Sequence, residues 1–248
     1  MRLLSLLLLL FIVACRSTTV IQHIDTKQYV FSDSTNSLID STAWKMIKPY
    51  SDSLDKIMNV VLAYTNQSLI KNTPEGLLGD FAAESCSELS KTTAKKMGIT
   101  NQDFTFLNNG GLRTSIPKGN ITRRNIYEVM PFENVLVIVT LNGNETNQLV
   151  NYIATQGGSP VSGLQMKIEN KHALEVKIGG IAFDSTKSYR VLTSDYLANG
   201  GDNLVFLKNA KKESLNLKVR DAMIYYLEGL NKNGDTLNIQ LDGRIRNN

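Results

Sequence analysis

The sequence predicts a mixed α/β fold, and three observations carry this prediction. Segments with apolar residues at helical spacing alternate along the chain with short runs rich in β-branched residues. Gly, Pro and Asn separate these segments where turns are expected. The composition, with 42% hydrophobic and 20% charged residues in a chain of 248, is that of a globular protein. Because helices and strands are interleaved, we expect an α/β or mixed α+β class.

The first fifteen residues predict export of the chain. Arg2 is followed by a compact apolar run that is too short to span a bilayer comfortably. The run ends at Ala14 and Cys15, in a pattern that resembles a bacterial lipobox. We therefore predict a signal peptide over residues 1–14 and a lipid on Cys15. That lipid would anchor the chain to a bacterial cell-envelope membrane, facing the periplasm or the exterior. The alternative is an ordinary secretory peptide with a chance cysteine.

Residues 15–40 are predicted to form a tether or peripheral segment, and residues 41–248 the folded domain. The tether is rich in Ser, Thr, Asn and Asp. The domain is expected to open with a helix over Ser51–Asn59, capped by Ser or Asp, and a buried strand over Val60–Thr65.

A long helix is predicted between Thr73 and Gly98. Lysines gather toward its end, and Gly98 is expected to stop it. Its apolar positions share one face, namely Leu77, Leu78, Phe81, Ala82, Cys86 and Leu89. Once Cys15 carries lipid, Cys86 has no partner for an intrachain disulfide, and we expect it to be a small buried apolar group.

The middle of the chain predicts two strand–helix pairs. A short strand over Phe104–Leu107 comes first, and a helix opened by Thr122 ends before Pro131. A strand over Asn134–Gly143 then leads to a helix over Asn144–Gln156, which Asn144 is expected to cap.

The last third of the chain predicts a hairpin, a strand, a helix and a closing strand. Residues 164–170 and 174–180 alternate polar and apolar side chains, as hairpin strands do. Tyr189–Asp195 is predicted as a strand, Leu217–Leu230 as a helix, and Asp235–Asp242 as the strand that closes the domain.

The first candidate site follows the Phe104–Leu107 strand. Asn108 precedes the adjacent glycines Gly110 and Gly111, which allow the backbone to approach a ligand closely. Arg113 stands just beyond them, and Phe132 follows the next helix. An arginine and an aromatic ring suit a flat, anionic ligand. The alternative is a strand, a glycine turn and a surface helix without a ligand.

The second candidate site follows the Tyr189–Asp195 strand. It places Tyr196, Asn199, Gly201 and Asp202 within one turn-sized stretch. Aromatic rings stack on bases, and a carboxylate accepts hydrogen bonds from a pair of ribose hydroxyls. One cationic loop and one acidic loop would together frame a nucleotide, with Phe132 and Tyr196 on either side of the base. The alternative is a pair of unrelated β-turns.

The sequence has few of the residue patterns that would bind a metal ion or a nucleic acid. The two histidines, His23 and His172, belong to no metal-ligand motif, and we expect His172 to be a surface strand residue. No nucleophile elbow or phosphate-binding P-loop is present. The net charge of +4 comes without a long basic run, so nucleic acid is not the expected partner. The residues are equipped to bind a nucleotide but not to cleave one.

Four segments carry a resemblance to a known family. Residues 108–143 closely resemble the central motif of the C-terminal domain of 5′-nucleotidases, and "LTSDYLANGGDN", residues 192–203, resembles its second motif. "EGLLGDFAAES", residues 75–85, is similar to the first helix of that domain, and "DGRI", Asp242–Ile245, also fits. The resemblance extends over about residues 55–246.

The resemblance implies a fold and a set of roles. The fold would be a layered α/β/β/α domain of two similar halves that holds the nucleoside. Phe132 and Tyr196 would sandwich the base, with tyrosine standing where phenylalanine is usual. Asp202 would hold the ribose hydroxyls, Asn108 would lie near the base or ribose, and Arg113 would contact the phosphate or ribose end.

The sequence departs from the family pattern at three positions. Asp80 stands where asparagine is usual, and Glu84 where aspartate is usual. The arginine expected just upstream of the first helix is missing, and only Lys71 is nearby. A lysine binds phosphate as a point charge rather than as a fork, so weaker phosphate binding is expected.

The resemblance and the missing metal ligands together suggest a split 5′-nucleotidase. In that family a metallophosphatase domain holds two metals, and no such domain is recognised here. This chain would then need no cofactor of its own, and a separate metallophosphatase chain would carry the divalent metals. The alternatives are a non-enzymatic lipoprotein that binds nucleosides or nucleotides, and a degenerate domain kept for protein contacts.

Overall fold

The computed structural model describes residues 24–28 and 40–247. The chain forms two compact units, Met1–Pro49 and Tyr50–Asn248, and the second contains the three sheets and both hydrophobic cores considered below. The predicted signal peptide, the lipidation site Cys15 and His23 lie outside the described residues. No helix in the described ranges is both long enough and apolar enough to cross a membrane.

The first described helix, α2, spans Ser41–Met58 and buries none of its residues. The helix predicted to begin at Ser51 therefore begins earlier. Asp40 accounts for the earlier start, because its carboxylate accepts hydrogen bonds from the Thr42 and Ala43 amides at 2.8 and 3.2 Å. Pro49 stands inside the helix and does not end it.

A five-stranded sheet forms the centre of the second unit. Its middle strand β9 pairs in parallel with β2 on one side and antiparallel with β4 on the other. Across the sheet the order is β10 (Lys211–Lys218), β4 (Val135–Leu141), β9 (Tyr189–Ser194), β2 (Phe104–Phe106) and β5 (Val161–Ser162). This sheet, with the helices around it, confirms the predicted mixed α/β class.

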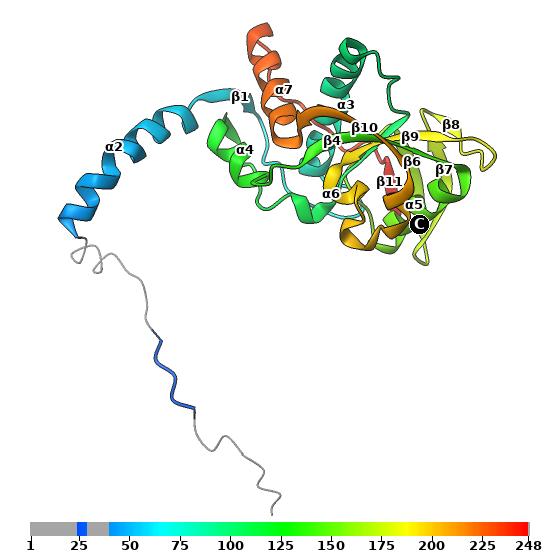
Figure 1. Cartoon of the computed structure of the whole chain (residues 1–248), viewed down its shortest axis with the longest axis horizontal. Helices are drawn as coiled ribbons and strands as arrows, with labels where there is room; N and C mark the ends of the chain where they lie inside the picture. The colour runs from blue at the N-terminus through cyan, green and yellow to red at the C-terminus, as the bar shows by residue number, and fades with distance from the viewer. Residues whose placement is uncertain (1–23, 29–39, 248) are drawn as a thin grey trace, which may run out of the picture. The chain divides into compact units, whose positions relative to one another are not determined.

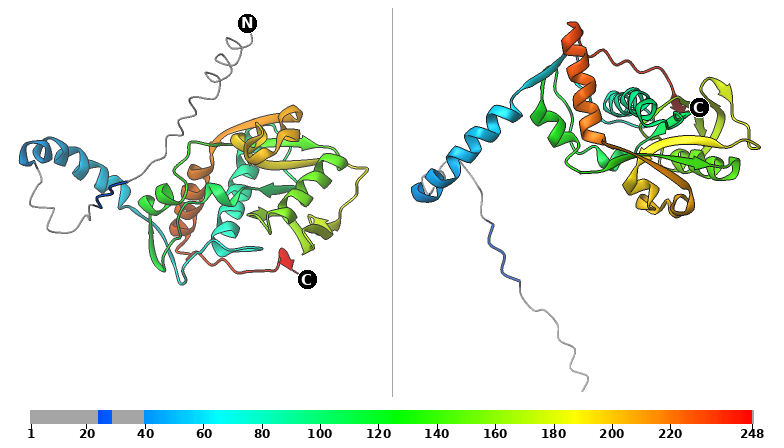
Figure 2. Two further views of the ribbon diagram at one scale, coloured as in Figure 1. Left: turned by 90° about the horizontal axis from the view of Figure 1, so that it is seen from below. Right: turned by 45° about the horizontal axis from the view of Figure 1, so that its top comes forward.

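Both faces of this sheet are buried, and β4 shows why. Leu136 and Ile138 enter the core that lies under α3 (Leu77–Met97) and α7 (Val219–Asn233). Val137 and Val139 point to the opposite core, which α5 (Gly143–Thr155) and a second sheet cover. A strand buried on both faces reads as a continuous apolar run, as this one does. Figures 1 and 2 show α3 and α7 side by side over one face of the sheet.

The second sheet contains the predicted hairpin. Strands β6 (Leu164–Glu169) and β7 (His172–Ile178) pair antiparallel, and His172 is exposed on β7 as expected. The short strand β8 (Ile181–Ala182) extends one edge, and β11 (Ile245–Asn247) pairs in parallel with β6.

The prediction of a closing strand over Asp235–Asp242 is wrong. Leu237 makes a single bridge with Thr65, and the strand that closes the domain is β11. The alternation that suggested a strand has another cause, because Leu237 and Ile239 are buried in the first core while their neighbours face solvent. Alternating burial along an irregular segment gives the same pattern as a half-buried strand.

Four further strands were not predicted from the sequence, namely β3 (Gly119–Thr122), β10 and the two-residue strands β5 and β8. β1 (Val61–Thr65) was predicted, but its antiparallel partner β3 was not. The edge strand β10 was also missed, because lysines and a glutamate fill its exposed half. Charged residues are common on edge strands, where they discourage pairing with other chains.

The helix ends mostly agree with the prediction. α3 ends at Gly98, which takes the left-handed conformation, and Thr122 caps α4 (Arg123–Val129). The predicted cap Asn144 is wrong, because Asn142 caps α5 and accepts a hydrogen bond from the Glu145 amide at 3.0 Å. Residue 143 must be glycine here, since a Cβ would stand 1.8 Å from the Ser185 carbonyl oxygen.

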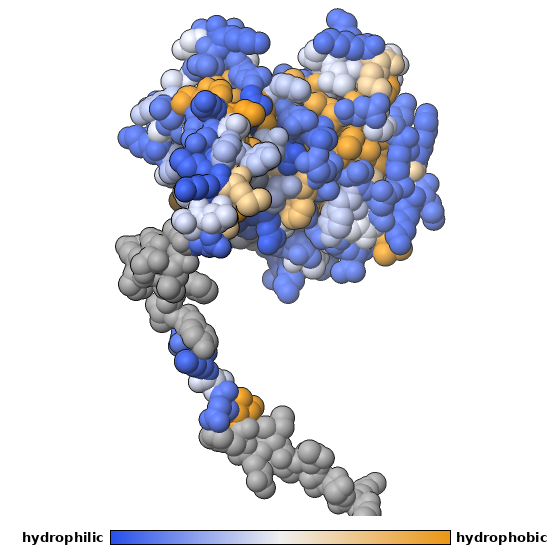
Figure 3. Space-filling view, turned by 60° about the vertical axis from the view of Figure 1, so that its left-hand side comes forward, coloured by the Kyte–Doolittle hydropathy of each residue, from blue (hydrophilic) through white to orange (hydrophobic). Residues whose placement is uncertain are grey.

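Figure 3 shows one face of the molecule, on which hydrophilic residues predominate and hydrophobic residues gather in smaller areas.

Cys86 is fully buried, which confirms its predicted place in the core, and burial raises the pKa of its thiol to about 12.

Candidate functional site

The candidate site lies at one end of the five-stranded sheet. Because β2 and β9 are parallel, the loops that follow them leave the sheet at the same end. β4 runs antiparallel to β9, so the segment that precedes β4 arrives at that end too. Ligands of open α/β sheets commonly bind at the carboxyl ends of parallel strands. The topology thus gathers the two loops predicted from the sequence and the Phe132 segment.

The first loop turns tightly after β2. Asn109–Gly111 form one turn of 3₁₀ helix, η2, and the Arg113 amide then donates to the Val129 carbonyl at 2.8 Å. A Cβ on Gly111 would stand 3.0 Å from Asn108 Oδ1, so glycine lets the Asn108 side chain fold over the turn. This loop places Asn108 and Arg113 on the same side.

A buried arginine of α7, Arg220, fixes the backbone of the segment that carries Phe132, residues 130–133. The Arg220 guanidinium donates to the carbonyls of Met130 and Phe132 at 3.3 and 3.4 Å and pairs with Glu133. It also lies 4.1 Å from the centre of the Tyr127 ring. Hydrogen bonds from Lys218 and Arg220 lower the pKa of Glu133 to about 2. The backbone is therefore fixed, while the Phe132 ring remains 42% exposed.

The second loop is tied to the start of β4. Asp195 opens the short helix α6 (Asp195–Ala198), and its Oδ1 accepts from the Val135 amide at 3.1 Å. A 3₁₀ turn, η3 (Gly201–Asn203), then brings Asp202 back over Tyr196. The Tyr196 hydroxyl donates to Asp202 Oδ1 at 2.7 Å.

These segments enclose a cavity of about 390 Å³. It falls within the usual size range of small-molecule sites. Its lining residues are Asn108, Gly110, Gly111, Arg113, Phe132, Asn134, Tyr196 and Asp202. The two aromatic rings are 42% and 46% exposed and make no ring contact with each other, so the space between the loops is not packed by the protein.

Two predicted residues lie outside the lining, and one lining residue was missed. Asn199 is exposed at the end of α6, and Gly201 lies behind Tyr196, where a Cβ would meet the ring at 2.5 Å. Asn134 lines the cavity, whereas the sequence predicted it only as the first residue of a strand. Its position two residues after Phe132 was the available signal.

The charges in the cavity are balanced. Arg113 is the one cation among the described lining residues, and Asp202 is the one anion. Lys71 does not supply a second cation, because its ammonium donates to the carbonyls of Asn109 and Leu112 at 3.4 and 3.2 Å. It fastens the first loop rather than lining the cavity. Within residues 24–28 and 40–247, no three His, Cys, Asp or Glu side chains are arranged to hold a metal ion.

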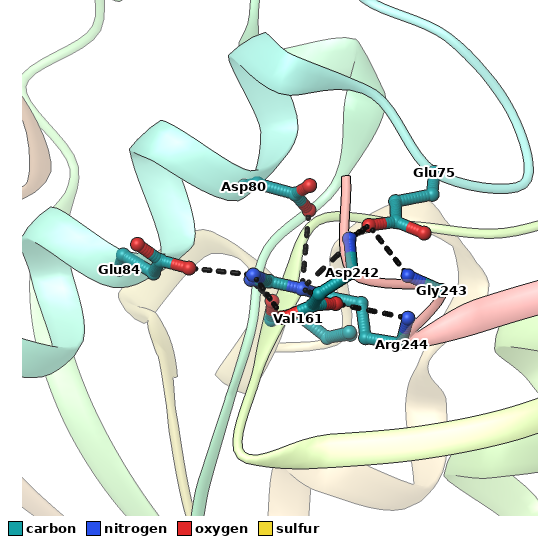
Figure 4. Close-up of polar contacts among 7 residues, drawn as sticks. All are labelled: Glu75, Asp80, Glu84, Val161, Asp242, Gly243 and Arg244. Carbon is teal, nitrogen blue, oxygen red and sulfur yellow. Dashed lines mark hydrogen bonds and ion pairs between the residues drawn. The ribbon is translucent and has the colours of Figure 1, made fainter. Parts of the chain in front are cut away.

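A second polar cluster lies outside the cavity lining and is centred on Arg244. Its guanidinium donates to Asp242 at 2.8 and 2.9 Å and to Glu84 at 2.5 Å, and its Nε lies 3.6 Å from Asp80 (Figure 4). Glu75 accepts from the Asp242 amide at 2.8 Å. The cluster thus joins the start of α3 to the segment that leads into β11.

Asp80 differs from the other carboxylates of this cluster. It is buried, and as a carboxylate its Oδ2 has no hydrogen-bond partner. Burial raises the pKa of Asp80 to about 8, an effect that Arg244 opposes and Glu75 reinforces. Once protonated, Asp80 can donate a hydrogen bond to the Glu75 carboxylate.

Comparison with known proteins agrees with this architecture. A family model described as "5′-nucleotidase, C-terminal domain" matches residues 57–209, more than half of the chain. The chain belongs to this family. The 5′-nucleotidase C-terminal domain assigned here includes both loops of the cavity, while the cluster around Arg244 extends beyond the matched residues.

Curated relatives support the assignment. A 5′-nucleotidase of Vibrio vulnificus is 28% identical over 173 residues, which cover 66% of this chain and 30% of that protein. A trifunctional nucleotide phosphoesterase of Bacillus subtilis is 28% identical over 220 residues, covering 79% of this chain and 14% of that protein. This 5′-nucleotidase C-terminal domain thus spans less than a third of the relatives it matches.

A solved structure has the same fold. A 5′-nucleotidase precursor of Thermus thermophilus superposes with a TM-score of 0.68 and 26% identity. The superposition covers 84% of this chain and 43% of that one. The similarity therefore includes most of the residues that build the 5′-nucleotidase C-terminal domain described above.

Proposed function

We propose that this chain binds the nucleoside part of a nucleotide, and that a separate metallophosphatase chain hydrolyses the phosphate ester. The observation that carries the proposal is the cavity of about 390 Å³, with Phe132, Tyr196, Arg113 and Asp202 around it. Exposed aromatic rings offer stacking surfaces to a base, and the two charged groups suit a phosphate and a pair of hydroxyls.

Each lining group has a place in this proposal. Phe132 and Tyr196 hold the base between them, and Asp202 accepts hydrogen bonds from the ribose hydroxyls. Asn108 donates to Asp202 Oδ2 at 2.6 Å and so orients that carboxylate. Arg113, with a guanidinium that contacts only the nearby Gly110 carbonyl at 3.3 Å among the hydrogen bonds described, reaches toward the phosphate.

The hydrolytic step is assigned to a partner. Water attacks phosphorus, and the bond between phosphorus and the ribose 5′ oxygen breaks. Metal ions lower the pKa of the attacking water and stabilise charge in such reactions. We propose that the lipid on Cys15 holds this chain at a cell-envelope membrane, facing the periplasm or the exterior, where it meets the partner chain.

The decisive experiment mixes this protein with a purified metallophosphatase chain of the same organism and measures phosphate release from AMP. We expect complex formation and a rate of release well above that of either chain alone. A Phe132→Ala protein serves as the control, because it keeps the rest of the chain unchanged and is expected to weaken base binding. If no complex forms and the rate does not rise, the proposal is wrong.

Phe132→Ala is expected to weaken adenosine binding by about 1–3 kcal/mol, the usual contribution of one aromatic ring stacked on a base. The ring is 42% exposed, so its loss should leave the fold intact. Titration calorimetry measures the affinity, with Tyr225→Ala on the exposed face of α7 as the matched control. Equal affinities for the wild type and Phe132→Ala would contradict the role of this ring.

A second candidate function is supported by the charges of the cavity. With one cation in the described lining and Lys71 engaged by backbone carbonyls, the site favours base and ribose over phosphate. We infer from this that a non-enzymatic lipoprotein that captures nucleosides is the alternative. Adenosine binding that is as tight as AMP binding, without activity in any mixture, would favour this alternative.

A further inference from the structure

We propose that the Tyr196 hydroxyl is a positioning group that makes the cavity selective for a vicinal diol. It acts through Asp202 and is separate from the stacking role of the Tyr196 ring. The inference rests on the proposed binding of a nucleoside, and it assigns to one oxygen atom the discrimination between ribose and sugars that lack its hydroxyls.

The Asp202 carboxylate is held at both of its oxygens. The Tyr196 hydroxyl donates to Oδ1 at 2.7 Å, and Asn108 Nδ2 donates to Oδ2 at 2.6 Å. The Asp202 amide also donates back to the Tyr196 hydroxyl at 3.3 Å. Two side chains from different loops thus fix the orientation of one carboxylate at the wall of the cavity.

The remaining acceptor capacity matches a diol. Each carboxylate oxygen accepts up to two hydrogen bonds. Tyr196 uses one acceptor position on Oδ1 and Asn108 uses one on Oδ2, which leaves one on each oxygen for a ligand. Two adjacent acceptors on a carboxylate of fixed orientation are complementary to two adjacent hydroxyls.

The backbone of the second loop is shaped around this contact. Gly200, Asp202 and Asn203 all have positive φ, at 90°, 52° and 65°. The last two are not glycines, so the turn is under strain that its surroundings must offset. Gly201 has no side chain, and a Cβ there would stand 2.5 Å from the Tyr196 ring. The loop therefore holds the Asp202 carboxylate against the Tyr196 hydroxyl.

The hydroxyl is a donor throughout the neutral range. Its hydrogen bond to the Asp202 carboxylate raises the pKa of Tyr196 above the ordinary value. Phenylalanine at this position would retain the stacking ring and lose only the two hydrogen bonds that the hydroxyl makes with the carboxylate and the amide of Asp202. Tyr196→Phe thus removes a single hydroxyl group and separates positioning from stacking.

The experiment measures binding of adenosine and of 2′,3′-dideoxyadenosine to the wild type and to Tyr196→Phe by titration calorimetry. We expect Tyr196→Phe to bind adenosine about five- to tenfold more weakly, since a hydrogen bond to a charged group is lost at a partly exposed site. Its affinity for the dideoxy ligand should change by less than about twofold, because that ligand has no 2′ or 3′ hydroxyl to donate to the Asp202 carboxylate. Tyr225→Phe, the same change at an exposed tyrosine, should alter neither affinity.

The outcomes separate this inference from the proposed function. If the wild type binds adenosine and Tyr196→Phe binds both ligands as the wild type does, the positioning role is wrong and the proposed function stands. Equal losses for the two ligands would also overturn it, because they would show a general effect on the ring or loop. If the wild type binds no nucleoside, both proposals fail.

A ligand-free measurement checks the underlying bond. In NMR spectra of the full protein with labelled tyrosine, the pKa of Tyr196 should be higher than that of an ordinary tyrosine. Asp202→Asn weakens the side-chain hydrogen bond that is the main cause of this shift and removes the acceptor's charge, so the pKa of Tyr196 should fall in that variant. An unchanged pKa would show that the hydroxyl is not bound to Asp202 in solution and would overturn the inference without reference to any ligand.

Discussion

Replacing Arg244 with methionine is expected to lower the free energy of unfolding by about 3–5 kcal/mol, the usual cost of removing one partner from a buried ionic cluster. Only 6% of the Arg244 side chain is exposed, and it faces Glu75, Asp80, Glu84 and Asp242. Methionine fills a similar volume but supplies no positive charge. Glu75 and Asp80, whose side chains are 8% and 3% exposed, would then lose the nearby cation, and the Val161 carbonyl would lose its donor.

Urea denaturation of the wild type and the variant measures this loss. Arg246→Met is the matched control, because Arg246 pairs with Glu175 at 2.8 Å and both side chains are 55% exposed. An exposed pair contributes less than about 1 kcal/mol, so the control should stay close to the wild type. Similar losses in both variants would show that the buried cluster is not what holds the C-terminal segment.

Asp80→Asn is expected to stabilise the domain by several kcal/mol above pH 8 and to flatten its stability between pH 5 and 8. The pKa of Asp80 is raised to about 8 in the folded protein, from 3.8. The folded state therefore holds a proton that the unfolded state has released, so wild-type stability falls as the pH rises through this window. Each unit of pKa shift corresponds to about 1.4 kcal/mol, which sets the scale of the effect.

Asparagine suits this position for a simple reason. Its amide group donates to Glu75 as a protonated Asp80 would, and it never ionises. Thermal and urea unfolding at several pH values between 5 and 9 test the prediction, with Asp235→Asn as a control at an exposed aspartate. A wild-type stability that stays constant or rises over this range, or a variant that follows the same pH curve, would contradict it.

Most of the residues that line the candidate site could be predicted from local sequence patterns. Glycine pairs after predicted strands marked both loops, and seven of the eight lining residues were in the predicted set, with Asn134 missed. Asn134 could not be assigned because only the antiparallel pairing of β4 with β9 brings the segment before β4 to the cavity. The bonds from Asn108 and Tyr196 to Asp202 were equally out of reach, since they depend on the distance between two loops.

In the fold too, some elements could be predicted from local sequence and others could not. The long helix α3, with its apolar face, and the strand β4, buried on both faces, were predicted because short-range sequence patterns determine them. β10 was missed, since a charged edge strand has little of the apolar pattern on which the prediction relied. The Arg244 cluster was also missed, because its carboxylates on α3 and their cation are about 160 residues apart, and no spacing rule joins them.

That separation has a consequence for how the molecule is made. A ribosome synthesises the acidic start of α3 long before Arg244, so during translation these carboxylates lack the cation that later stabilises them. Nascent chains fold from their N-terminal side as they emerge. Here the start of α3 should therefore gain the full stability of this cluster only after residue 244 has been synthesised.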